Sequence, residues 1–186
     1  MRILGVDPGS LITGYGIIDD SKQMPLLIDY GVVKLSSKDV LTVRLKSIYD
    51  EIYKLIKKYK PDCLSIETAF YGKNIQSTLK LGQARGVAII AALNSGIEVI
   101  EYSPREVKKS VTGNGASSKN RVLNYVSSIL SISEQPKYID SSDALAVALC
   151  HYFSLNTLPM IKKGKRNKSK GWDEFIKHNQ NKIIRN

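Results

Sequence analysis

The sequence predicts an α/β fold in which α-helices flank a mixed five-stranded β-sheet. Short apolar runs bounded by turn residues indicate strands, and apolar residues three and four positions apart indicate amphipathic helices. After residue 60 the predicted strands and helices alternate, which favours parallel strands joined by helical crossovers. With 186 residues, of which 42% are hydrophobic, the chain can bury one substantial core.

The first third of the chain predicts three antiparallel strands and a helix. Ile3 to Asp7 is expected to form a short buried strand, and Gly14 to Asp19 follows a Pro-Gly-Ser turn as the second strand of a hairpin. Asp29 to Leu35 is expected to add a third strand. Residues 40–59 carry apolar side chains at helical spacing, and Pro61 ends this helix.

The next part alternates between strands and helices. Cys63 to Glu67 is predicted to be a central strand, residues 75–94 a helix, and Gly96 to Tyr102 another strand. Because a β-α-β-α-β order implies parallel pairing, the sheet as a whole is predicted to be mixed.

Three further helices are predicted. Ser103 and Glu106 have the spacing of a capping box around a proline at the first helical position, and Gly113 ends that helix. Another helix is expected to start near Ser117 or Ser118, and residues 141–153 form the last one.

Composition excludes several classes of protein. No segment approaches the roughly 20 apolar residues that span a bilayer, and the start lacks the apolar run of a signal peptide, so a cytoplasmic location is the default expectation. Cys63 and Cys150 are far apart and lack the spacing of a zinc site or disulfide framework. Both are predicted to be buried thiols.

Charge divides the chain into a domain, residues 1–158, and a basic C-terminal tail, residues 159–186. Residues 162–186 hold nine Lys or Arg against two acids, a net +7 of the total +11. A polar, like-charged segment of this kind is expected to be flexible and to attract polyanions. A purely solubilising end is the alternative.

Four acidic residues are placed where carboxylates can converge: Asp7, Glu67, Asp140 and Asp143. Asp7 and Glu67 end two predicted strands, which would meet at one sheet edge if the strands are parallel. Asp140 and Asp143 are three residues apart at a helix start and can share one side of its first turn. Carboxylate oxygens can bind divalent metal ions, and a basic chain attracts the phosphate backbone of a nucleic acid. Metal held in this way can promote attack on that backbone, so a nuclease is the first interpretation.

Each acidic residue also has a purely structural interpretation. Asp140 could cap the last helix, with Asp143 answering it in a capping box. Asp7, which precedes Pro-Gly, could be a turn residue. Glu67 is harder to explain in this way, because an unpaired carboxylate at the end of a buried strand costs several kcal/mol.

Four stretches of the sequence carry a family resemblance: ILGVDPGSLITGYG, SIETAFYGKNIQSTLKLGQARGVA, EYSPREVKKSVTGNGASSK and DSSDALAVAL. They resemble, in order and spacing, the characteristic stretches of RuvC, the bacterial Holliday junction endonuclease family. The resemblance covers residues 1 to 155 and implies an RNase H-like fold. It also implies symmetric nicking of two strands of a four-way junction in recombination and repair, leaving 5′-phosphate and 3′-hydroxyl ends.

The resemblance assigns roles to particular residues. It implies that the four carboxylates are catalytic and hold two Mg²⁺ ions per subunit, for which Mn²⁺ can substitute. Lys119 matches a catalytic lysine that neutralises charge on the phosphate, and Lys108 one that holds the DNA backbone. The further expected DNA contacts are the flanking basic residues and two aromatic residues that stack on opened bases: Arg105, Lys109, Phe70 and Tyr71. Arg121 departs from the family pattern.

The expected partners are four-way junction DNA and a second copy of the chain. Gly82 and Gly86 lie four apart on one helix and leave a bare face, on which another helix could pack in a homodimer. Close packing onto the chain's own sheet is the alternative. RuvA and RuvB, the branch-migration proteins, are candidate partners that the sequence does not decide.

Two other function classes compete with the nuclease. A non-catalytic junction-binding protein would share the basic surface and the aromatic loop, but it would not need four carboxylates. An actin-like phosphotransferase shares the strand-aspartate-glycine opening. Such enzymes need two domains, and 186 residues show no second glycine-rich phosphate loop.

Overall fold

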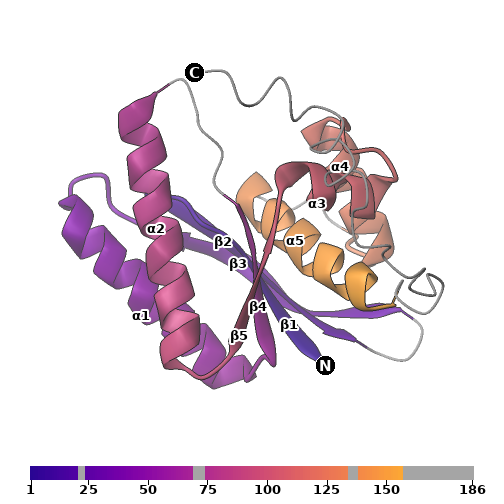
Figure 1. Ribbon diagram of the computed structural model, residues 1–186, viewed down its shortest axis with the longest axis horizontal. Helices are drawn as coiled ribbons and strands as arrows, with labels where there is room; N and C mark the ends of the chain where they lie inside the picture. The colour runs from indigo at the N-terminus through magenta and orange to yellow at the C-terminus, as the bar shows by residue number, and fades with distance from the viewer. Residues whose placement is uncertain (21–23, 69–73, 134–137, 157–186) are drawn as a thin grey trace, which may run out of the picture. The chain divides into compact units, whose positions relative to one another are not determined.

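The five strands form one mixed sheet, as predicted, and the structure gives their order across the sheet as β3-β2-β1-β4-β5. The computed structural model describes residues 1–20, 24–68, 74–133 and 138–156 (Figure 1). The strands are β1 (Arg2–Asp7), β2 (Ile12–Asp20), β3 (Pro25–Lys34), β4 (Cys63–Glu67) and β5 (Glu98–Tyr102). The helices are α1 (Leu41–Tyr59), α2 (Ile75–Asn94), α3 (Pro104–Thr112), α4 (Lys119–Ile129) and α5 (Ile139–Asn156).

Strand direction brings two of the predicted site residues to the same edge of the sheet. β1 pairs antiparallel with β2 but parallel with β4, with Val6 opposite Ile66. β4 in turn pairs parallel with β5. Asp7 and Glu67, the next residues on β1 and β4, therefore leave the sheet side by side.

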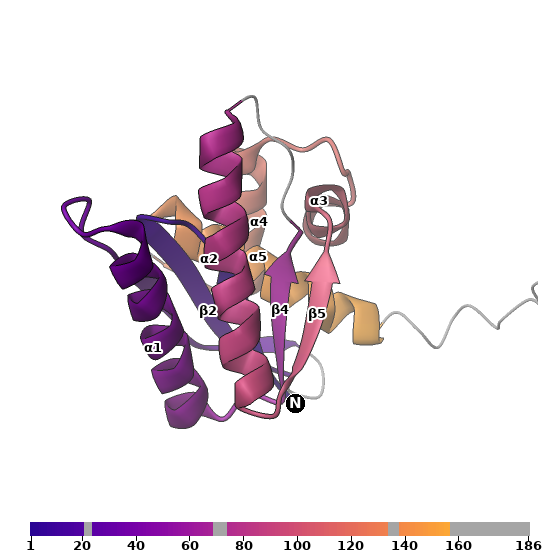
Figure 2. The same cartoon turned by 60° about the vertical axis from the view of Figure 1, so that its left-hand side comes forward.

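Helices cover both faces of the sheet, α1 and α2 on one and α3, α4 and α5 on the other (Figures 1 and 2). Alternate residues of each central strand supply the two cores. Leu4 packs with the buried residues of α1 and α2, whereas Ile3 packs with those of α3, α4 and α5. This is the side-chain alternation expected of a strand that is buried on both faces.

Helix α5 lies unusually close to the sheet because glycines face it. A Cβ atom on Gly5 would lie 2.1 Å from the carbonyl oxygen of Ala144, and one on Gly14 would lie 2.0 Å from that of Asp140. Neither distance leaves room for a methyl group, so only glycine permits this approach. The approach fixes the first turns of α5 against β1 and β2.

Most predicted element boundaries are confirmed. Residues 75–94 form α2 as predicted, and Ser103 and Glu106 form the expected capping box of α3. The prediction for β3 was too short, since the strand starts at Pro25. The capping interpretation of Asp140 is wrong, because α5 starts at Ile139 and Asp140 already lies in its first turn.

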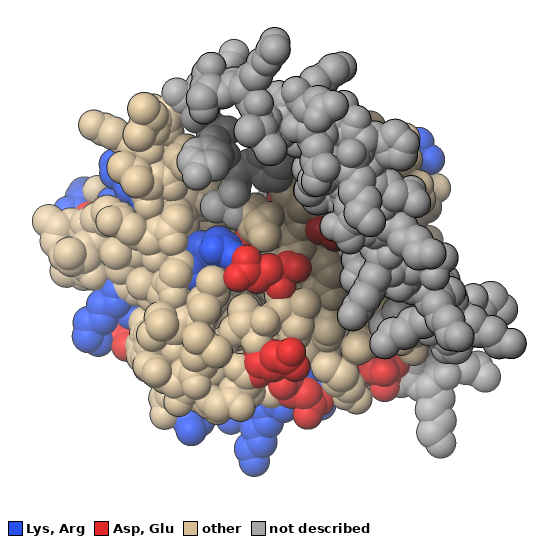
Figure 3. Space-filling view, viewed as in Figure 1, with Lys and Arg blue, Asp and Glu red and all other residues tan. Residues whose placement is uncertain are grey.

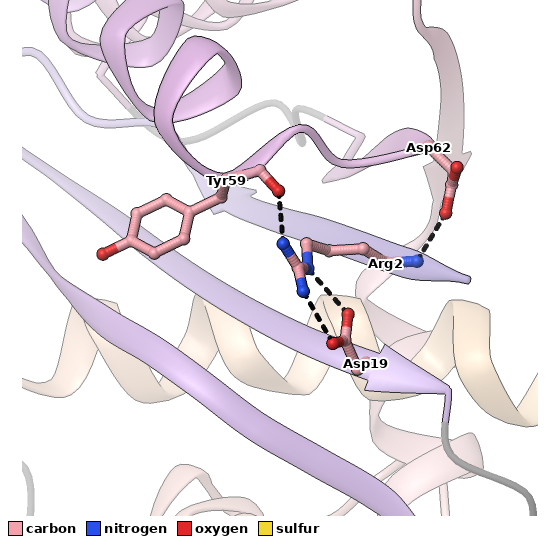
Figure 4. A network of polar contacts seen from close by, with 4 residues as sticks. All are labelled: Arg2, Asp19, Tyr59 and Asp62. Atoms are coloured by element: carbon pink, nitrogen blue, oxygen red, sulfur yellow. Dashed lines mark hydrogen bonds and ion pairs between the residues drawn. The ribbon is translucent and has the colours of Figure 1, made fainter.

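A polar network fastens the opposite end of β1 (Figure 4). The guanidinium of Arg2 donates two hydrogen bonds to the carboxylate of Asp19, at 2.7 and 2.8 Å, and one to the backbone oxygen of Tyr59 at 2.6 Å. The backbone N–H of Arg2 donates to Asp62 at 2.6 Å. One residue thus links the start of β1 to the end of β2 and the last turn of α1.

Some predictions concern residues that the structure does not describe. Phe70 and Tyr71 lie outside the described residues, and so does the basic segment 159–186. Cys63 and Cys150 are buried free thiols, as predicted. None of the helices in the described ranges has the length and apolar character needed to cross a membrane.

Candidate active site

A pocket of about 320 Å³ opens at the sheet edge where β1 and β4 end. Its polar lining combines carboxylates with basic side chains, and its apolar wall comes from α2, α3, α4 and α5. The lining residues are Asp7, Pro8, Glu67, Thr68, Leu81, Arg85, Pro104, Val107, Lys108, Lys119, Val122, Asp143 and Ala146.

The fold brings the predicted acidic residues to this pocket from three separate elements. Asp7 and Glu67 line it from adjacent parallel strands, and Asp143 lines it from α5. Asp140 is not among the lining residues, although its charge acts on Asp7. The approach of α5 to Gly14 holds the backbone of Asp140 next to the sheet.

Burial and mutual repulsion both disfavour the charged form of these carboxylates. Burial, with added repulsion from Asp143, Glu67 and Asp140, raises the pKa of Asp7 to about 7. Burial also raises the pKa of Glu67, and the charge of Asp143 adds to it. The ionised form of these carboxylates is therefore favoured only where a cation balances their charge.

Lys119 supplies part of that balance. Its ammonium group donates a hydrogen bond to Asp143 Oδ2 at 3.1 Å, and this bond raises the pKa of Lys119. Lys119 is the first residue of α4, where the side chain of Ser118 accepts a hydrogen bond from the backbone N–H of Arg121 and caps the helix. The cap fixes the point from which the lysine reaches the pocket.

A second hollow beside the pocket is lined by basic residues of α3. Lys108 lines both, and with Arg105 it faces the turn at Asn114 and Gly115. Arg105 and Lys109 lie one helical turn apart along the same helix and line a neighbouring hollow. The four lysines and arginines predicted to contact DNA thus follow one another from the carboxylates outward. The guanidinium of Arg121 lies over the ring of Tyr125, 5.7 Å from its centre.

The donor set fits a hard divalent cation. Asp7, Glu67 and Asp143 present only carboxylate oxygens, the ligands that Mg²⁺ and Mn²⁺ prefer. A cation would also relieve the repulsion that raises the pKa of Asp7. Within the described part of the chain, no three or more Asp, Glu, His or Cys side chains are arranged closely enough to hold a metal ion as they stand.

One charged residue of the pocket wall, Arg85, was not predicted from the sequence. It lies on α2 among small and apolar residues, and its Nε donates a hydrogen bond to the backbone oxygen of Glu67 at 3.1 Å. The only signal in the sequence was a single charge within the run LGQARGVAII. Nothing in that run shows which element the charge faces.

Comparison with known proteins decides the family. The family described as "Crossover junction endodeoxyribonuclease RuvC" matches residues 3–151. The chain belongs to the RuvC family. Relatives of that name are 46% identical in Chloroherpeton thalassium, over all of both chains, and 46% identical in Cytophaga hutchinsonii, over 97% of this chain and 87% of the relative. The RuvC family is one of endonucleases, and this confirms the predicted class of enzyme.

Solved structures confirm the fold. RuvC from Thermus thermophilus is 29% identical, with a TM-score of 0.76 over 84% of this chain and 96% of that one. The same protein in complex with a Holliday junction substrate gives a TM-score of 0.79 over the same shares. The yeast mitochondrial resolvase Ydc2, at 16% identity and a TM-score of 0.58, shares the fold. The predicted RNase H-like architecture is therefore correct.

Proposed function

We propose that the chain resolves Holliday junctions by divalent-metal-dependent nicking of two strands, leaving 5′-phosphate and 3′-hydroxyl ends. The observation that carries the proposal is the convergence of Asp7, Glu67 and Asp143 with Lys119 in one pocket of a RuvC-family chain. Carboxylates gather in this way where a phosphate backbone is cut with the help of metal.

Asp7, Glu67, Asp140 and Asp143 are the residues proposed to hold the metal, two Mg²⁺ ions per subunit, with Mn²⁺ as a substitute. When bound, the ions would supply an activated water and stabilise charge on the departing 3′-oxygen. The carboxylates would determine where the ions sit, because the ends of β1 and β4 and the closely packed helix α5 hold these side chains in place.

The lysines act on the DNA. Lys119 reaches into the pocket beside Asp143, so its ammonium group can neutralise charge that builds up on the scissile phosphate. Lys108 lines both the pocket and the adjoining hollow, so it can hold the backbone next to the point of cleavage. Arg105 and Lys109 extend that track. Phe70 and Tyr71, outside the described residues, are proposed to stack on bases opened at the junction centre.

The protein is proposed to act as a homodimer, because a four-way junction has two equivalent strands to cut. On α2, Cβ atoms at Gly82 and Gly86 would meet nothing within 4 Å, so these glycines do not pack on the chain's own sheet. Beside them a largely apolar hollow of about 400 Å³ lies between α1 and α2. Exposed Leu79, Ile90 and Leu93 enlarge this apolar face of α2.

Three further parts of the proposal rest on the sequence. A cytoplasmic location fits an enzyme that acts on junction DNA, and the basic segment 159–186 is proposed to be a flexible, polyanion-binding tail. RuvA and RuvB remain candidate partners.

Asp7→Asn tests the function, because it removes a ligand charge with almost no change in bulk. We expect the variant to bind a synthetic four-way junction in Mg²⁺-free buffer within about twofold of wild type, and to lose at least about 10²-fold in Mg²⁺-dependent nicking. Asp39→Asn, the same change at an exposed position before α1, serves as the control. Undiminished nicking by Asp7→Asn would contradict the assignment, and a wild-type chain that binds but never cuts would favour the non-catalytic alternative.

A further inference from the structure

Arg85 is a mostly buried cation in the wall of the active-site pocket. Its side chain is 19% exposed, and it spans from α2 to the ends of two strands. Nε donates to the backbone oxygen of Glu67 at 3.1 Å, and Nη2 forms an ion pair with the carboxylate of Glu101 on β5. One guanidinium thus ties α2 to both β4 and β5.

The backbone oxygen of Glu67 lies where the sheet can no longer supply a donor. The pairing of β1 with β4 ends at Val6 and Ile66, and Pro8, which follows the end of β1, has no N–H with which to extend it. On the other side, Thr68 N–H already donates to Tyr102. A part-buried carbonyl left without a donor is destabilising, so Arg85 supplies a bond that the pairing of β1 with β4 does not.

Glu101 sets the direction of the guanidinium. It lies opposite Ile66 in the β4–β5 register, one residue before the level of Glu67. Its side chain is 48% exposed, so one end of the bridge faces solvent while the other faces Glu67. Figure 3 views this side of the molecule, where a basic and an acidic surface meet near the centre.

We propose that Arg85 is a positioning residue that fixes the end of β4, so that the Glu67 carboxylate points into the pocket and binds metal at full strength. The inference deepens the proposed function, because it concerns the metal site on which that function rests. Arg85 acts through the backbone of Glu67 and touches neither substrate nor metal.

A direct DNA contact is the competing role for a cation in this wall. Two nitrogens of the Arg85 guanidinium already bind Glu67 and Glu101, which favours a role in positioning the end of β4. The two roles respond differently to Arg85→Lys. A lysine keeps the positive charge that a phosphate needs, but its single ammonium group cannot reproduce a planar fork that holds two partners.

The experiment compares full-length wild type with Arg85→Gln, Arg85→Lys and Glu101→Gln. Lys57→Gln, an exposed residue in the last turn of α1, controls for the loss of one positive charge. Three quantities are measured: Mn²⁺ affinity by electron paramagnetic resonance titration, junction affinity in metal-free buffer, and single-turnover nicking at increasing Mn²⁺. Glu101→Gln keeps the test valid if the arginine variants fold poorly, because Glu101 is half-exposed.

For Arg85→Gln we expect the affinity for Mn²⁺ and the rate of nicking at subsaturating Mn²⁺ to fall about 10- to 100-fold, the loss seen when a residue that supports a metal ligand is removed. Its affinity for the junction should stay within about twofold of wild type. Arg85→Lys should remain deficient, Glu101→Gln should lose about threefold to tenfold, and Lys57→Gln should match wild type. Unchanged Mn²⁺ affinity in Arg85→Gln, or full recovery in Arg85→Lys, would overturn the inference. A wild type that binds Mn²⁺ but cuts no junction would refute the proposed function alone, since the Mn²⁺ titrations still decide the role of Arg85.

Discussion

Gly14→Ala is the sharpest test of how the carboxylates are brought together. Gly14 lies opposite Asp7 in the β1–β2 register and faces the first turn of α5. A Cβ atom there would lie 2.0 Å from the carbonyl oxygen of Asp140, 2.4 Å from its carbonyl carbon and 3.0 Å from the nitrogen of Ser141. All three are backbone atoms, so no side-chain rotation can relieve the contact.

The geometry sets the size of the effect. Real Cβ contacts stay above 3.0 Å, so β2 and the start of α5 must separate by at least about 1 Å. Overpacking of this kind costs about 1–3 kcal/mol, and occasionally more. Because Asp140 and Asp143 move with α5, a displacement of about 1 Å should also slow nicking about 10²-fold.

Urea unfolding and single-turnover nicking measure the two effects. The control is Asn124→Ala, because Asn124 is exposed inside α4, outside both the pocket lining and the proposed dimer face. Alanine has the higher helix propensity, so this change should stabilise the protein by at most about 0.7 kcal/mol and leave nicking unchanged. The two substitutions are expected to change the free energy of unfolding in opposite directions. If Gly14→Ala kept wild-type stability and nicking, the close approach of α5 would not be what assembles the site.

Two further predictions concern pH. The pKa of Asp7 is raised to about 7 in the folded state, so its ionisation destabilises the fold as pH rises from about 4 to 7. Asp7→Asn should therefore stabilise the metal-free protein at pH 8, by at most about 4 kcal/mol in the free energy of urea unfolding. A variant no more stable than wild type would refute this prediction. Asp19 behaves oppositely, because its hydrogen bonds with Arg2 lower its pKa and stabilise the fold above the unfolded pKa, an effect lost as pH falls through the folded value. Arg2→Gln should lower the free energy of unfolding by at most about 1 kcal/mol at pH 7, since the side chains of Arg2 and Asp19 are both about one-third exposed. The difference in stability between wild type and variant should become smaller below about pH 4. A difference that stays constant with pH would show that Asp19 is not the partner through which Arg2 stabilises the fold.

The parts of the fold that follow from local pattern could be predicted. Apolar spacing and terminal residues located α2 and α3. The sequence also predicted that Asp7 and Glu67 would meet at one sheet edge if their strands were parallel, and the structure shows that they are. The resemblance to a family then assigned the chemistry of these positions. Local pattern was enough here because each signal lies within a few residues of the feature it predicts.

Contacts between distant segments were out of reach. A capping rule suggested that Asp140 would precede the last helix, but α5 starts at Ile139. The backbone of its first turn packs on Gly14, more than 120 residues away in the chain. Arg85 is similar, since its partners Glu67 and Glu101 are 18 and 16 residues away on two different strands. A sequence shows that a glycine or an arginine is present, but only the fold shows what it approaches.

These contacts between distant segments explain how the fold stays stable although its active-site carboxylates destabilise it. Burial and repulsion raise the pKa of Asp7 and Glu67, so the ionised site opposes folding at neutral pH. The opposing free energy must come from packing that does not depend on the site's charge. The buried contact of α5 with Gly5 on β1 and Gly14 on β2 supplies such packing, and it lies close to the positions of Asp7 and Asp143. The same backbone approach therefore both creates the electrostatic cost and stabilises the fold against it, which is why one methyl group at Gly14 should damage stability and cleavage together.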